Sequence, residues 1–107
     1  MDARTDRVSV VREVNGRLDI ATAADVGREL REGIVVPATH LVLRLGRVSF
    51  LDSSGLGMLV GLQKELTNAG GRLVLCEVPP QARMALRLTR LEWLLSSFET
   101  LEEATAA

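Results

Sequence analysis

With 107 residues, the chain is long enough for one domain with one hydrophobic core and too short for two. Its residues are 47% hydrophobic and 25% charged, a balance that excludes the disordered and fibrous classes of protein. The 13 basic and 14 acidic residues are dispersed along the chain and leave a net charge of −1, which argues against nucleic acid as a partner.

No apolar stretch approaches the roughly 18 residues that suggest a membrane span, and the start of the chain lacks the apolar core of a signal peptide. We therefore expect a cytoplasmic protein without a membrane span. The single cysteine, Cys76, lies in the apolar run LVLC, which predicts a small buried side chain. One cysteine and one histidine leave no soft metal site, and we expect neither a metal nor a cofactor.

The chain opens with the pattern of a β-hairpin. Residues 8–14 mix β-branched and polar side chains, as a half-buried strand does. Asn15 and Gly16 then form a dipeptide that favours a two-residue turn, and residues 17–20 follow as the expected return strand. This pattern predicts that the sheet begins with an antiparallel pair.

A helix and a central strand are expected next. The helix should begin at Thr22, a good N-cap residue, and end at Gly33. After a break at Pro37, residues 40–50 alternate and then run apolar, as expected for a strand whose two faces are both covered. This strand leads directly to Asp52.

Residues 53–69 have the pattern of a second helix, which two glycines close. At about 100° per residue, one face carries an apolar stripe, and two further apolar residues widen the stripe toward its flank. The stripe consists of Leu56, Leu59, Val60 and Leu66, and the flanking residues are Met58 and Leu62.

The last third of the chain alternates strands and helices. Residues 72–78 predict a buried strand, and a proline pair then suits the start of a helix over residues 81–91. A short strand within residues 96–100 and a final helix over residues 101–107 complete the pattern. Strands that alternate with helices over this length predict an α/β domain, a small mixed sheet with about four helices packed on it.

The stretch FLDSSGLGMLVG (residues 50–61) admits more than one functional interpretation. Its Gly-x-Gly resembles a dinucleotide-binding turn, but the third glycine comes one position late and Asp52 would repel phosphate. Neither Ser53 nor Ser54 lies in a nucleophile elbow. His40 lies at the far end of the preceding strand, where we expect a surface histidine too distant to act as a base. We therefore expect no enzyme.

A third interpretation is that Ser53 is itself a substrate, exposed at a helix N-terminus where another protein docks. A phosphate there would gain from the helix dipole and from free amides of the first turn, so the fold should tolerate it. Its charge of roughly −1.5 to −2 would lie beside Asp52 and oppose association. The alternative is that Asp52 or Ser53 merely caps the helix.

Three stretches of the sequence resemble the STAS family, and specifically the bacterial anti-sigma factor antagonists. They are GRLDIATA (16–23), HLVLRLGRVSFLDSSGLGML (40–59) and GGRLVLCEVPPQARMAL (70–86), of which DSSGLG is the specific part. The resemblance implies a single STAS domain over residues 1–107, with a core of about residues 8–104.

The resemblance also implies a function. Such a protein binds an anti-sigma factor that is also a serine kinase, and so frees a sigma factor. The phosphoacceptor is the first serine after the aspartate, which places it on Ser53, and a metal-dependent serine phosphatase reverses the modification. The expected partner-binding residues are Asp19, Thr22, Asp52, Ser53, Ser54, Gly55 and Leu56, and the helix pattern adds Met58 and Leu62.

A related domain with another role is the alternative: a STAS interaction subunit of a transport complex, or of a stress-sensing scaffold. For either role we expect a monomer or a weak dimer.

Overall fold

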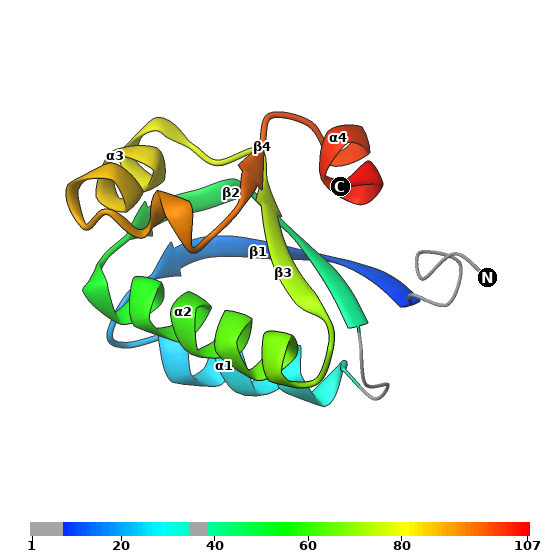
Figure 1. Ribbon diagram of the computed structural model, residues 1–107. Coiled ribbons are helices and arrows are strands. Elements are labelled where there is room, and N and C mark those ends of the chain that lie inside the picture. The colour runs from blue at the N-terminus through cyan, green and yellow to red at the C-terminus, as the bar shows by residue number, and fades with distance from the viewer. Residues whose placement is uncertain (1–7, 35–38) are drawn as a thin grey trace.

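The computed structural model describes residues 8–34 and 39–107, in which four parallel strands form one sheet (Figure 1). The strands follow one another across the sheet in chain order, so each crossover is a βαβ connection between neighbours. The expected break at Pro37 lies outside the described residues. The strands are β1 (Val8–Leu18), β2 (Thr39–Leu51), β3 (Arg72–Cys76) and β4 (Ser97–Phe98).

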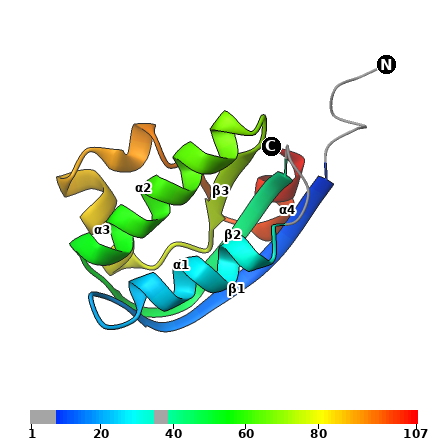
Figure 2. The ribbon, with the colours of Figure 1, turned by 90° about the horizontal axis from the view of Figure 1, so that it is seen from below.

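Helices cover the two faces of the sheet unequally. One face packs against α1 (Ala23–Glu32) and α2 (Ser53–Asn68), which lie side by side in Figure 2, and against α3 (Pro80–Leu88). The short α4 (Leu101–Ala106) covers part of the other face, and a 3-10 turn, η2 (Leu91–Trp93), follows α3. The expected helices are thereby confirmed.

Two apolar clusters hold these layers together. The large one joins alternate residues of the central strands, such as Leu41, Leu43 and Leu73, to the inner faces of α1, α2 and α3. The small one lies on the opposite face, where Val42 and Val74 are packed beneath α4. Both faces of β2 are therefore covered in its first part, over residues 39–43, which explains the continuous apolar run there.

The expected N-terminal hairpin is wrong, and with it the expected mixed sheet. Residues on both sides of Asn15 and Gly16 belong to one strand, which pairs in parallel with β2 from Val8 to Leu18. Gly16 has a positive φ of 78°, but this conformation accompanies register shifts in the ladder and does not reverse the chain. Pairing along the whole of β2 outweighs the local preference of the dipeptide for a turn.

His40 was expected at the surface and is instead fully buried. It lies at the start of the central strand, where α4 folds back over it, and its Nε2 is 3.3 Å from the carbonyl oxygen of Ala104. Cys76 is buried as predicted, and burial raises the pKa of its thiol.

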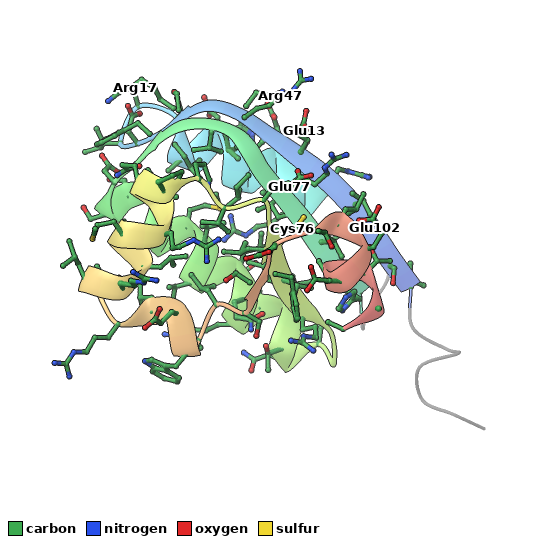
Figure 3. The ribbon with its side chains drawn as sticks, turned by 90° about the horizontal axis from the view of Figure 1, so that it is seen from above. Glu13, Arg17, Arg47, Cys76, Glu77 and Glu102 are labelled. Atoms are coloured by element: carbon green, nitrogen blue, oxygen red, sulfur yellow. The ribbon has the colours of Figure 1, made fainter. Side chains whose placement is uncertain are left out.

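The uncovered part of the sheet carries charged side chains. Figure 3 shows Glu13, Arg17 and Arg47 along β1 and β2, with Glu77 nearer to α4. Arg44 donates hydrogen bonds of 2.9 and 3.0 Å to the two carboxylate oxygens of Glu77. This contact lowers the pKa of Glu77, mainly through the hydrogen bond from Arg44. Charge therefore marks this face as one exposed to solvent.

Candidate functional site

The junction between β2 and α2 is built around the carboxylate of Asp52. Its Oδ1 accepts hydrogen bonds from the amides of Ser54, at 2.8 Å, and Gly55, at 3.2 Å. Asp52 has extended backbone angles and serves as the N-cap of α2. A carboxylate at this position satisfies two amides of the first turn and complements the helix dipole. The capping interpretation of Asp52 is therefore correct, whatever else this residue does.

Ser53 is the first residue of α2, and its side chain is exposed, whereas Ser54 is half-buried. Gly55 follows at a point of close approach, because a Cβ atom there would lie 2.4 Å from the carbonyl oxygen of Leu18. No side chain fits against a backbone atom at that distance. The requirement for glycine fixes the helix start against β1, and it holds Ser53 on the outside.

A second rigid turn, between β1 and α1, is organised by Asp19. Arg17 donates a hydrogen bond of 2.8 Å to Asp19 Oδ2, and Ala21 donates its amide to Oδ1. The hydroxyl of Thr22 accepts from the amide of Asp19 and donates to the carbonyl of Arg17. The pKa of Asp19 is lowered, first of all by the hydrogen bond from Arg17. Asp19 and Thr22 therefore stabilise this turn and keep its shape fixed.

The two turns lie together at the carboxyl ends of neighbouring parallel strands. The amide of Asp52 donates a hydrogen bond of 3.3 Å to the carbonyl of Leu18. Beside them, between α1 and α2, is a shallow hollow of about 360 Å³, whose lining includes Ile20, Arg31, Ser54 and Met58. Five of the expected partner-binding residues are thus brought to one surface: Asp19, Thr22, Asp52, Ser53 and Ser54.

Other expected partner-binding residues lie behind this surface. Leu56, on the apolar stripe, is buried. Leu62 is only 1% exposed, because the flank of α2 to which it was assigned packs into the core. Both side chains belong to the core, so they are not part of the expected partner-binding surface. Met58 is 9% exposed, and it lines the hollow beside α1.

Sequence reasoning missed Ile20. This side chain is 83% exposed, although it lies between two residues that anchor the turn, Asp19 and Ala21. The only signal in the sequence was an isoleucine at the end of a predicted strand, where burial is the ordinary expectation. An exposed apolar side chain on a rigid turn is suited to contact another protein.

Neither a metal-binding cluster nor a histidine lies beside Ser53 in the described part of the chain. Among residues 8–34 and 39–107, no three His, Cys, Asp or Glu side chains are grouped to hold a metal ion. His40 is buried at the opposite end of β2 and cannot serve Ser53 as a base. Residues 52–54 instead present an exposed hydroxyl on a fixed helix start, next to an apolar hollow.

These features define an α/β domain with an exposed serine at the start of α2. The chain belongs to the STAS domain family, whose pattern matches residues 1–104. It is 35% identical over 85 residues to an anti-sigma F factor antagonist of Paenibacillus polymyxa, an alignment that covers 78% of this chain and 72% of the relative.

Two solved structures extend the comparison. The anti-sigma factor antagonist SpoIIAA in its unphosphorylated form has a TM-score of 0.74 and 29% identity, with 92% of this chain and 85% of that chain covered. The STAS domain of a SulP transporter from Vibrio cholerae has a TM-score of 0.71 and 20% identity, with 92% and 78% covered. The second likeness shows the fold alone. In the described part of the chain, no helix is both long and apolar enough to span a membrane.

Proposed function

We propose that this protein is an anti-sigma factor antagonist controlled by phosphorylation of Ser53. The unphosphorylated form binds an anti-sigma factor that is also a serine kinase, and a sigma factor is released. The kinase phosphorylates Ser53 and binding is lost, and a serine phosphatase restores it. The observation that carries this proposal is the exposed Ser53 hydroxyl at a capped helix start beside an apolar hollow.

The charges around Ser53 support an electrostatic switch. Asp19 is paired with Arg17, but no described cation lies within ion-pair distance of Asp52. Its negative charge is met only by the amides of the helix start. A phosphate on Ser53 would add a charge of roughly −1.5 to −2 beside that carboxylate.

The structure changes one expectation about that phosphate. Free amides were expected to receive it, but those of Ser54 and Gly55 already bond to Asp52. We infer that the phosphate stays in solvent and faces the partner. A loss of about 3 to 4 kcal/mol of interface energy would weaken binding several hundredfold, and burying a dianion against a docked surface can supply it.

A kinase assay tests the proposal at its first step. The protein is incubated with ATP and candidate anti-sigma kinases from the same genome, and its intact mass is measured. We expect one phosphate on the wild type and on the matched control Ser54→Ala, and none on Ser53→Ala. A phosphate on Ser54 or elsewhere, or none with any kinase of this type, would contradict the assignment.

The transport or scaffold alternative has weaker support. The relatives named as anti-sigma factor antagonists match at 28% to 35% identity, whereas the likeness to the SulP transporter domain is one of fold. Co-purification with a transporter, in the absence of any kinase that modifies Ser53, would favour the alternative.

A further inference from the structure

Three large apolar side chains are exposed together on α3 and η2. Met84 is 53% exposed, and Leu88 and Trp93 are each 77% exposed. Trp93 is the only tryptophan of the chain. A domain whose core is filled by leucine and valine gains nothing for its folding by placing its largest apolar side chain in water. Such a group of exposed side chains marks an interaction site.

The local structure places two of these side chains on one face and the third on the neighbouring turn. Met84 and Leu88 are four residues apart on α3, and therefore lie on the same face of the helix. The 3-10 turn η2 packs against α3 and carries Trp93. Figures 1 and 2 show α3, in yellow, and η2, in orange, at the end of the molecule opposite α4.

This end of the molecule is basic. Arg83, Arg87 and Arg90 lie on α3 and the residues that follow it, and no ion pair involves them within the described residues. Glu92 is the one acidic residue between Pro80 and Ser97. Trp, Met and Arg are among the residue types enriched at protein interfaces. We call these residues the α3–η2 surface: Arg83, Met84, Arg87, Leu88, Arg90 and Trp93.

The backbone conformation of Arg90 also supports an interaction site on this surface. Arg90 has a φ of +58°, in the left-handed region that favours glycine, just after the last turn of α3. An arginine is a strained choice there, because its Cβ atom crowds the following carbonyl. Its presence is accounted for if the guanidinium has a use outside the fold.

We propose that the α3–η2 surface is a second docking site, which takes an acidic amphipathic helix of another protein. The apolar side of that helix covers Met84, Leu88 and Trp93, and its carboxylates pair with the three arginines. The site does not include Ser53, and it does not depend on the proposed antagonist function, although Gln81 at the start of α3 bonds to the backbone of Leu51 near the Ser53 turn.

Two other occupants fit the surface less well. The three arginines would attract an anionic membrane as well, but three apolar side chains offer a membrane little to bury. A second copy could offer the exposed Glu99, Glu102 and Glu103 near α4. That contact would join unlike ends of the molecule and would build a ring or an open chain of copies.

A peptide selection tests the proposal with the whole chain. A displayed library of tryptophan-free helical peptides is selected against the protein, and the binders are titrated while Trp93 fluorescence is followed. We expect peptides rich in acidic and large apolar residues, with a shift of the Trp93 emission to shorter wavelength. Binding should weaken at least about tenfold in Leu88→Asp and in Arg87→Glu. Arg47→Glu, an exposed change on the open sheet face, is the matched control and should bind normally.

Several results would overturn the proposal. They are the absence of acidic binders, an unchanged Trp93 emission, and equal binding by Leu88→Asp and the wild type. A Trp93 shift with anionic vesicles but not with peptides would assign the surface to membranes, and self-association lost in Leu88→Asp would assign it to a second copy. Arg90→Gly should raise the melting temperature and weaken peptide binding; unchanged binding would contradict the role given to its side chain.

Discussion

Asp52 should contribute to stability and to the switch through separable properties. Its carboxylate caps α2 through the amides of Ser54 and Gly55, and its charge adds to the repulsion of a phosphate on Ser53. Asp52→Ala removes both properties. Asp52→Asn removes the charge but keeps an oxygen that can accept the same two hydrogen bonds, since asparagine is as good an N-cap as aspartate.

The expected loss of stability follows from the two interactions that the Asp52 carboxylate makes at the helix start. Loss of an N-cap side chain costs about 1 kcal/mol, and loss of a negative charge at a helix N-terminus adds about 0.5 kcal/mol. Asp52→Ala should therefore lower the free energy of unfolding by about 1.5 kcal/mol, which in a domain of this size lowers the melting temperature by about 6 to 12 °C. Asp52→Asn should lose only the charge contribution of about 0.5 kcal/mol.

Urea unfolding followed by far-ultraviolet circular dichroism measures both variants. Circular dichroism is preferable to fluorescence, because Trp93 is already exposed in the folded protein and reports unfolding weakly. An Asp52→Ala variant as stable as the wild type would refute the capping role. Equal destabilisation by the two substitutions would show that charge, and not hydrogen bonding, accounts for the effect.

Three further substitutions or probes test other parts of the account. Gly55→Ala should destabilise the fold by about 2 to 3 kcal/mol, because its Cβ would meet the carbonyl oxygen of Leu18 at 2.4 Å; chemical denaturation that shows wild-type stability would refute this. The pKa of Glu77 is depressed by Arg44, so its contribution is present above the ordinary carboxyl value of 4.5 and is lost as the pH falls through the lower folded value. Arg44→Gln should consequently lose less stability than the wild type on acidification from about pH 5 to 3, and parallel pH profiles would count against the pair. Buried Cys76 should react with a thiol reagent only on unfolding, and rapid reaction of the native protein would contradict its burial.

The parts of the fold that were predictable have strong local signals. The helix after Asp52 is specified by a capping side chain, an apolar stripe and closing glycines, and it forms as expected. The Asn15-Gly16 dipeptide is also a strong local signal, yet the chain continues as one strand there. Its preference for a turn is small beside the pairing of this eleven-residue strand along β2, and that pairing is not visible in a short window of sequence.

The errors in the site come from packing between distant segments. His40 is buried because α4, more than sixty residues later, covers the start of β2. Leu62 was assigned to the surface because helical periodicity gives the direction of a side chain but not the neighbour that covers it. Ile20 was missed for the opposite reason: the turn that exposes it is held by local hydrogen bonds of Asp19 with Ala21 and Thr22, which a pattern of apolar residues does not reveal.

The central claim is that a phosphate on Ser53 abolishes binding without changing the fold. The most direct measurement is the affinity of the anti-sigma kinase for the two forms of this protein, by calorimetry, with circular dichroism of each form. The account predicts affinities that differ several hundredfold and superimposable spectra. Equal affinities would contradict it, and so would a loss of binding accompanied by a loss of helical signal.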